Sequence, residues 1–226
     1  MISTTTEKPE VYQGQFGEFT ITPGDRTSVV VYRTALAVAA LCFAVGTAAV
    51  LWQANNPTVV KSLAILWACF CAALGVSLAT IHIYLAPLHR ALQIFWAVGC
   101  TSAGLMAAIS EQPLALAVYT HPLALMGVGF VFVALTGIFF KEAFCFNRLE
   151  TKLLTFIVPL LLLGHWIGWL PVQSERSLLA TWAVLFLIFA LRKSIQPIPP
   201  DIGDKTVFTY LREQRSNSQQ LHLENE

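Results

Sequence analysis

Six long runs of apolar residues divide this chain, and each is long enough to cross the hydrocarbon core of a bilayer. They cover about residues 29–52, 62–85, 91–109, 123–140, 153–170 and 178–191. A transmembrane helix needs about 20 mostly apolar residues, whereas a barrel strand alternates in polarity over about ten. Because the bilayer interior has no water to bind backbone amides, we predict an all-α, polytopic transmembrane helical bundle of six spans.

Composition supports a membrane setting and argues against a water-soluble domain. Charged residues make up 12% of the 226 residues, about half the ~25% that is usual in soluble domains. So few charges cannot cover a water-facing surface, and the lipid bilayer is the first partner that we expect. The net charge of +1 gives no reason to expect a nucleic acid partner.

Lysine and arginine lie mainly at one end of the predicted spans. Nine of them fall near one face: Arg26, Arg33, Arg90, Lys141, Arg148, Lys152, Arg192, Lys193 and Lys205. Only Lys61 and Arg176 fall near the other face. By the positive-inside rule, this bias predicts short cytoplasmic ends, with both termini on the cytoplasmic side of a multi-pass protein.

We divide the chain into residues 1–28, a cytoplasmic N-terminal segment, residues 29–191, the transmembrane domain, and residues 192–226, a cytoplasmic tail. Tyr12–Thr22 contains strand-forming residues, but a lone strand is unstable. We therefore expect it to rest on the membrane face of its own chain or on a partner.

Within the tail, residues 204–215 are predicted to form a short interfacial helix, with Val207, Phe208 and Leu211 on one face. The polar residues from Ser216 onward are expected to be disordered.

Two joints leave the span boundaries open. Leu114–Tyr119 is apolar but is separated from the fourth span by His121-Pro122, so it either lengthens that span, lies in the interface or re-enters the membrane. The sixth span has only about 14 apolar residues, and starting it at Arg176 would lengthen it.

Two patterns concern the packing and chemistry of the spans. Small residues recur every four positions in the first three spans, which predicts close helix contacts: Ala40, Ala44, Ala48, Ala64, Ala68, Ala72, Gly99, Ala103 and Ala107. No acidic or basic residue lies in the middle of any span, which argues against an ion-coupled pump.

Histidines are the candidate cofactor ligands, because a neutral imidazole can ligate a haem iron or a chlorophyll magnesium. His121 and His165 are the cross-helix pair expected near the outer boundary. The alternative is that both are ordinary hydrogen-bonded side chains, and our primary expectation is that the protein carries no cofactor. The five cysteines have neither a disulfide nor a zinc spacing, so no metal site is predicted.

The most distinctive segment is Phe139–Lys152, predicted as the inner loop between the fourth and fifth spans. Its aromatic and charged residues suit a protein partner or lipid headgroups, and the predicted docking residues are Phe140, Lys141, Glu142, Phe144, Cys145, Phe146 and Arg148. Cations near Cys145 would favour its thiolate. The alternative is an ordinary positive-inside loop with an unreactive cysteine.

Two segments carry a resemblance to a known family: Pro23-Gly-Asp-Arg26, and Phe140-Lys-Glu-Ala-Phe-Cys-Phe-Asn-Arg-Leu-Glu150. Together they resemble an uncharacterised integral membrane family, a domain of unknown function, of cyanobacteria and chloroplasts. The resemblance covers roughly residues 16–193. It implies a photosynthetic setting, with the thylakoid or plasma membrane as the location, and transfers no catalytic or ligand residue.

The sequence favours a non-enzymatic assembly, docking or stabilising factor for membrane complexes, with a membrane-protein partner. A carrier or channel for a small neutral solute is the first alternative, with a path lined by Ser77, Thr80, Thr101, Thr136 and the kink expected at Pro159. A cofactor-binding protein using His121 and His165 is the second alternative. No catalytic residue is predicted.

Overall fold

The computed structural model describes residues 10–223, and within them six helices are long and apolar enough to cross a membrane. They are α1 (Pro23–Gln53), α2 (Pro57–Thr80), α3 (Ala86–Ile109), α5 (Pro122–Phe146), α6 (Leu149–Trp166) and α7 (Val172–Ile195). The predicted all-α bundle of six spans is confirmed. Residues 1–9 of the N-terminal segment and 224–226 of the tail lie outside the described residues.

Polar caps start the first two helices earlier than the apolar runs do. The Thr22 hydroxyl accepts a hydrogen bond from the Asp25 amide at 3.2 Å, and the Asp25 carboxylate accepts one from the Thr22 amide at 2.7 Å. This reciprocal capping box starts α1 at Pro23. The Asn56 side chain accepts from the Thr58 amide and starts α2 at Pro57.

The predicted inner loop is largely helical, so that prediction is wrong. Helix α5 continues through Phe146, and α6 begins at Leu149. Asn147 ends α5 in the left-handed conformation at φ 51°, a helix end that asparagine tolerates well. The charged residues Lys141 and Glu142 therefore belong to the last two turns of a helix.

The structure shows the helix boundaries at the two open joints. The segment before His121 forms its own short helix α4 (Leu114–Thr120), which packs beside α2, α3 and α5. It does not lengthen the fourth span, because Pro122 starts α5 afresh. The sixth span is not short, since α7 starts at Val172 directly after Pro171.

Small residues line only some of the predicted contacts. Ala40, Gly99 and Ala103 are buried, as predicted. Ala64, Ala68 and Ala72 are exposed, because α2 turns a different face to the core, the one bearing Phe70, Leu74 and Leu78. Aromatic rings fill the centre of the bundle, where Phe43 and Trp182 lie 4.4 Å apart between ring centroids.

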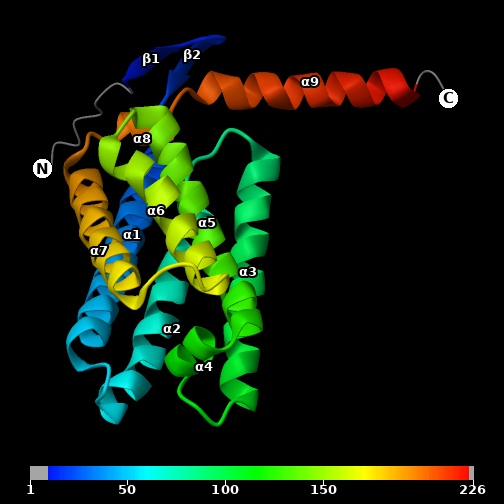
Figure 1. Cartoon of the computed structure of the whole chain (residues 1–226). Helices are drawn as coiled ribbons and strands as arrows, with labels where there is room; N and C mark the ends of the chain where they lie inside the picture. The colour runs from blue at the N-terminus through cyan, green and yellow to red at the C-terminus, as the bar shows by residue number, and fades with distance from the viewer. Residues whose placement is uncertain (1–9, 224–226) are drawn as a thin grey trace, which may run out of the picture.

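Figure 1 shows the hairpin of β1 (Val11–Gly14) and β2 (Gly17–Thr20) at the end of the bundle where α8 (Pro199–Ile202) and α9 (Lys205–Leu223) also lie. We call this end the hairpin face, and the end where α4 lies the opposite face. The two strands are antiparallel, with Tyr12 opposite Phe19. The predicted single strand is thus a hairpin.

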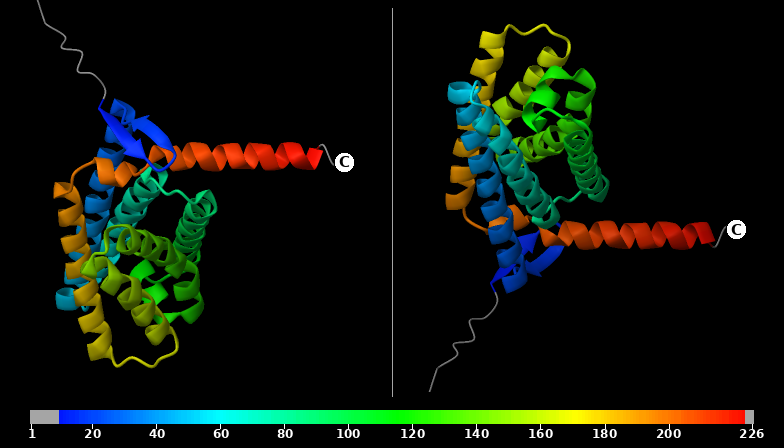
Figure 2. Two further views of the ribbon diagram at one scale, coloured as in Figure 1. Left: turned by 90° about the horizontal axis from the view of Figure 1, so that it is seen from above. Right: turned by 90° about the horizontal axis from the view of Figure 1, so that it is seen from below.

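Helix α9 is longer than predicted and leaves the bundle. It continues to Leu223, so the predicted disorder from Ser216 is wrong as far as that residue. In both views of Figure 2 the helix runs outward past the ends of the spans. Figure 1 shows it lying crosswise to them, the direction expected of a helix that lies along a membrane surface.

Candidate docking site on the hairpin face

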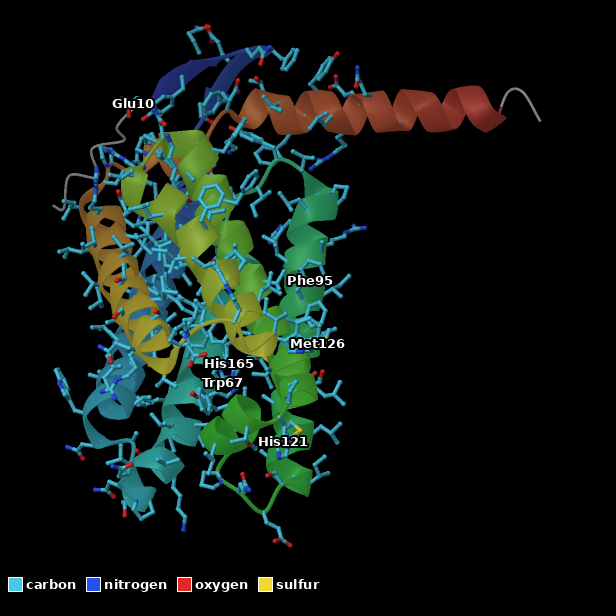
Figure 3. The ribbon with its side chains drawn as sticks, viewed as in Figure 1. Glu10, Trp67, Phe95, His121, Met126 and His165 are labelled. Carbon is cyan, nitrogen blue, oxygen red and sulfur yellow. The ribbon has the colours of Figure 1, made fainter. Side chains whose placement is uncertain are left out.

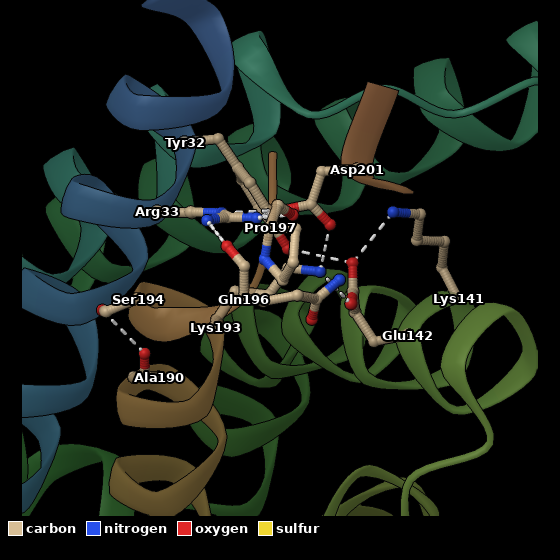
Figure 4. Close-up of polar contacts among 10 residues, drawn as sticks. All are labelled: Tyr32, Arg33, Lys141, Glu142, Ala190, Lys193, Ser194, Gln196, Pro197 and Asp201. Atoms are coloured by element: carbon tan, nitrogen blue, oxygen red, sulfur yellow. Dashed lines mark hydrogen bonds and ion pairs between the residues drawn. The ribbon is translucent and has the colours of Figure 1, made fainter. Parts of the chain in front are cut away.

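Five buried side chains from four helices meet beneath the hairpin face, as Figure 4 shows. We call them the ion network: Tyr32 and Arg33 of α1, Glu142 of α5, Lys193 of α7 and Asp201 of α8. Arg33, Glu142, Lys193 and Asp201 are at most 8% exposed at their side chains. The sequence pattern placed Arg33 and Lys193 near the ends of their spans and Glu142 in the inner loop, whereas the structure buries all three.

Arg33 joins the first helix to the segment that follows the last span. Its guanidinium approaches the Asp201 carboxylate at 2.6 Å. It also donates to the backbone carbonyls of Gln196 and Pro197, the latter at 2.8 Å. Such charge-assisted bonds are the strongest hydrogen bonds in proteins. The Pro-rich segment 196–202, which we call the strap, is therefore tied to α1.

Lys193 lies between the two carboxylates of the network. Its ammonium is 2.5 Å from Glu142 Oε2 and also contacts Asp201 Oδ1. The same ammonium lies 4.1 Å from the centre of the Phe146 ring, which adds a cation–π contact. Lys193 thus links α5, α7 and the strap at one point.

Glu142 is satisfied on both of its oxygens. The Tyr32 hydroxyl donates to Oε1 at 3.2 Å, and Lys141 Nζ approaches the same atom at 2.8 Å. Burying a charge without partners costs roughly several kcal/mol of folding free energy. The complete pairing of Glu142 offsets that cost in this cluster. The arrangement fixes the strap in one position rather than offering a vacant reactive group.

The strap leads into α9 through a tight turn against the loop between α2 and α3. Gly203 has φ 72°, a conformation that glycine adopts without strain. The Asp204 amide then donates to the Tyr84 hydroxyl, and the Phe208 ring lies 4.7 Å from the Tyr84 ring. Gly203 and Tyr84 together set the direction in which α9 leaves the bundle.

Asp204 joins α9 to the hairpin. Its carboxylate accepts from the Gln15 amide at 2.6 Å, and from the Thr206 amide and hydroxyl at 2.9 and 2.6 Å. Partial burial acts to raise the pKa of Asp204, but these hydrogen bonds from Thr206 and Gln15 outweigh it and hold the pKa below its ordinary value. The carboxylate is therefore charged at neutral pH.

Ring stacking strengthens the same joint. The Phe16 ring lies parallel to the Tyr210 ring at a centroid distance of 4.0 Å, and the Phe16 amide donates to the Thr206 hydroxyl. Lys205 Nζ donates to the Thr20 carbonyl and pairs with Asp25 at 2.8 Å. All of these contacts fall on the first two turns of α9.

The predicted docking residues divide into two groups. Phe140, Phe144, Cys145 and Arg148 are exposed, and Phe144 is 83% exposed. Glu142 is buried in the ion network, while Lys141 and Phe146 contact that network and are partly covered. The exposed surface available to a partner is therefore the outward side of the end of α5.

The histidine pair is placed in two different environments (Figure 3). His121 is exposed at the start of α5. His165 binds Glu175 through Nδ1 at 2.7 Å and the Tyr119 carbonyl through Nε2 at 3.0 Å. With both ring nitrogens engaged, His165 presents no free lone pair to a metal. Among residues 10–223 no group of three or more metal-ligating side chains comes together.

Three of the four hydroxyls proposed for a solute path bond to their own helices. Thr80, Thr101 and Thr136 each donate to carbonyls of their own helix. Ser77 is buried, and its hydroxyl has no partner among the described residues. The five cysteines are free, and Cys145 is exposed.

The sequence indicates the burial of Arg33 but not the partner that it binds. Arg33 shares one face of α1 with the buried residues Val29, Leu36 and Ala40, at the spacing of successive helical turns. That pattern could have marked Arg33 as buried. Its partner Asp201 lies 168 positions away, and nothing local in the sequence connects the two.

A family model described as an uncharacterized integral membrane protein (DUF2301) matches residues 76–210, more than half of the chain. The match includes Tyr84, Glu142, Lys193, Asp201 and Asp204. No curated protein and no solved structure matches the chain significantly.

Proposed function

The chain belongs to this family of uncharacterized integral membrane proteins, and from that premise we propose that it is a non-enzymatic docking or assembly factor for membrane complexes. The hairpin face would hold the partner, itself a membrane protein. The observation that carries this proposal is the course of α9, which is fixed at its first two turns and then extends beyond the bundle (Figures 1 and 2).

A helix in this position needs a surface to lie on. Isolated helices are marginal in water, and most of their stability in proteins comes from packing an amphipathic face. The contacts of Thr206, Phe208 and Tyr210 account for the beginning of α9. A partner or the bilayer surface would support the rest, and the rigid strap would hold the helix at a constant height above the spans.

Exposed aromatic residues extend this surface along the end of α5. Phe140 is 56% exposed and Phe144 is 83% exposed, both close in sequence to the cations Lys141 and Arg148. Aromatic and arginine side chains are the residues that most often dominate binding energy at protein interfaces. The proposed docking surface therefore combines α9 with Phe140, Phe144 and Arg148.

The positive-inside bias supports placing the hairpin face in the cytoplasm. The resemblance to cyanobacterial and chloroplast proteins supports a photosynthetic membrane, thylakoid or plasma membrane, as the setting. The carrier alternative has less support, because three of the four hydroxyls proposed for its path, those of Thr80, Thr101 and Thr136, bond to their own helices. We propose no cofactor for this function.

Site-specific photo-crosslinking in native membranes tests the proposal. A photoreactive residue replaces Phe144, or Phe156 as the control, because Phe156 is 73% exposed in the middle of α6, where it faces lipid. We expect a protein adduct of defined mass from position 144 and none from position 156. The adduct should disappear when residues 214–226 are deleted. Equal crosslinking at both positions, or recovery of the protein alone from every sample, would contradict a docking role.

A further inference from the structure

A second feature lies in the other half of the bundle, a cavity of about 550 Å³ near the opposite face. Six helices contribute to it: the end of α1, the start of α2, α4, the first half of α5, the end of α6 and the start of α7. Its walls are mostly apolar, and include Val50, Leu63, Leu116, Leu162 and Leu179. A smaller cavity of about 220 Å³ adjoins it and shares Val50, Leu63 and Ala115. The larger volume falls in the range of ligand-binding pockets, about 300–1,000 Å³.

One face of α7 lines this cavity, and the polarity of its side chains changes along the helix. Val172, Glu175, Arg176, Leu179 and Trp182 all line it, and their spacing of three and four positions places them on one side of the helix. The charged residues lie in the first turns and the apolar ones follow deeper in the span. The wall is thus polar at the membrane boundary and apolar toward the interior.

The acid at the rim is already satisfied within the protein. Glu175 receives His165 Nδ1 at 2.7 Å on one oxygen and the Tyr119 hydroxyl at 3.2 Å on the other. Its side chain is 13% exposed, and that of His165 is 23% exposed. This group ties α4, α6 and α7 together, and it does not compensate the neighbouring arginine.

Arg176 is the rim residue with unused binding capacity. Its guanidinium donates to the Leu51 carbonyl at 2.7 Å, and within residues 10–223 it forms no ion pair. A guanidinium has five N–H donors, so donors remain for a ligand. The rim therefore presents one uncompensated positive charge next to an apolar chamber.

Trp182 borders the deep end of the cavity but offers no polar contact to a ligand. The residue is 1% exposed, and its indole Nε1 is covered by protein atoms and has no hydrogen-bond partner in the described part of the chain. Arg176 is therefore the residue of α7 whose donors are available to a ligand.

We propose that this cavity binds one anionic glycerophospholipid, with an acyl chain inside and the phosphate at Arg176. The six residues from Arg176 to Trp182 rise about 9 Å along the helix, so the apolar wall continues well below the phosphate. The apolar wall excludes a small polar solute, and the unpaired arginine selects an anionic headgroup over a zwitterionic one. This site is separate from the docking surface on the hairpin face.

The binding test uses the full chain in nanodiscs made with dioleoylphosphatidylcholine, to which dioleoylphosphatidylglycerol is added as the probe. Native mass spectrometry counts the lipid retained per chain. We expect one phosphatidylglycerol to be retained by the wild type. Arg176→Gln should weaken retention roughly tenfold, the loss expected for charge-assisted hydrogen bonds.

Matched controls separate the site from general surface effects. Lys61→Gln removes the other cation of the opposite face, which does not line the cavity, and should leave retention unchanged. Ala115 lines both cavities, so Ala115→Trp fills cavity space and should abolish lipid retention. Ala107→Trp makes the same change at an exposed position of α3 and should leave retention unchanged. Thermal unfolding of every variant establishes that it is folded, and Leu179→Trp replaces Ala115→Trp if the latter does not fold.

Three results would overturn the proposal. The first is equal retention of phosphatidylglycerol and phosphatidylcholine, and the second is equal loss in Arg176→Gln and Lys61→Gln. The third is displacement of phosphatidylglycerol by oleate added as a competing probe, which would identify a fatty-acid site. Failure of the crosslinking experiment at Phe144 leaves this test untouched, since the two sites lie at different ends of the bundle.

Discussion

The carboxylate of Asp201 in the strap reaches the guanidinium of Arg33 in α1 at 2.6 Å, with both side chains buried. Asp201 also contacts Lys193, so a single carboxylate compensates two buried cations. This relationship connects the first and last spans to the segment that carries α9. It makes the position of α9 a consequence of how the bundle folds.

Replacing this carboxylate should be severely destabilising. We expect Asp201→Asn to cost about 3–5 kcal/mol, because it leaves Arg33 and Lys193 without their shared anion in a buried site. Thermal unfolding in detergent measures the loss. The control is Arg26→Gln, which removes a pair with Glu10 in which the two side chains are 46% and 70% exposed, and should cost about 0–1 kcal/mol. Similar losses in both variants would contradict the role assigned to the network.

Gly203 should not tolerate a side chain. Its φ of 72° is strained for alanine, and a Cβ there would overlap the Tyr84 hydroxyl. Gly203→Ala should therefore release the strap and speed the amide exchange of α9. Gly168 is the matched control, because it has φ 66° but open space around it, so Gly168→Ala should cost only the backbone strain of about 1–2 kcal/mol. If Tyr84→Phe partly rescues Gly203→Ala, the steric explanation holds; no coupling between them would count against it.

The joint between the hairpin and α9 should weaken only in acid. Because hydrogen bonds hold the pKa of Asp204 below its ordinary value of 3.8, its contribution to stability is present above that value. It is lost as the pH falls through the lower pKa of the folded state. In a protein labelled with ¹⁵N-glutamine, the Gln15 amide shift should titrate with a midpoint below 3.8, and Asp204→Asn should abolish the step. A midpoint above 3.8 would show that the hydrogen bonds do not favour the charged form.

Features of this structure that depend on residues close together in the sequence were predicted, whereas features that depend on distant residues were not. Span number and helical type depend on local apolar length, and both were predicted correctly. Helix ends depend on single residues, and the end of α5 was missed because Asn147, rather than Lys141, terminates it. The buried face of α2 was also missed. Alanines at 64, 68 and 72 permit a close helix contact, but their spacing does not show whether another helix packs there.

The buried ion network could not be predicted for a different reason. A lysine or arginine near the end of a span is usually solvated, and only its partners reveal burial. Lys193 is buried because Glu142 and Asp201 converge on it from two other elements. The same holds for the joint of Phe16 with Tyr210, since neither residue differs locally from an ordinary surface aromatic.

Membrane orientation can be read from a native cysteine. Cys145 is exposed at the end of α5 on the hairpin face. If that face is cytoplasmic, a membrane-impermeant maleimide should label Cys145 in inverted vesicles and not in right-side-out ones. In a Cys145→Ser background, Lys61→Cys at the opposite face should give the reverse pattern. Cys69, which is exposed within α2, should stay unlabelled because lipid covers it. Labelling of Cys145 from the outside would reverse the proposed topology.

The engagement of His165 leads to a spectroscopic prediction. Its two ring nitrogens bind Glu175 and the Tyr119 carbonyl, so an iron or magnesium ion could be ligated only by breaking one of these hydrogen bonds. We therefore expect the protein, purified gently from its native membrane, to show no visible absorption band. His165→Gln should lower the thermal midpoint by a few degrees, since it loses part of a side-chain network joining α4, α6 and α7. A coloured preparation whose band disappears in His165→Gln, but persists in His121→Gln, would instead identify His165 as a ligand.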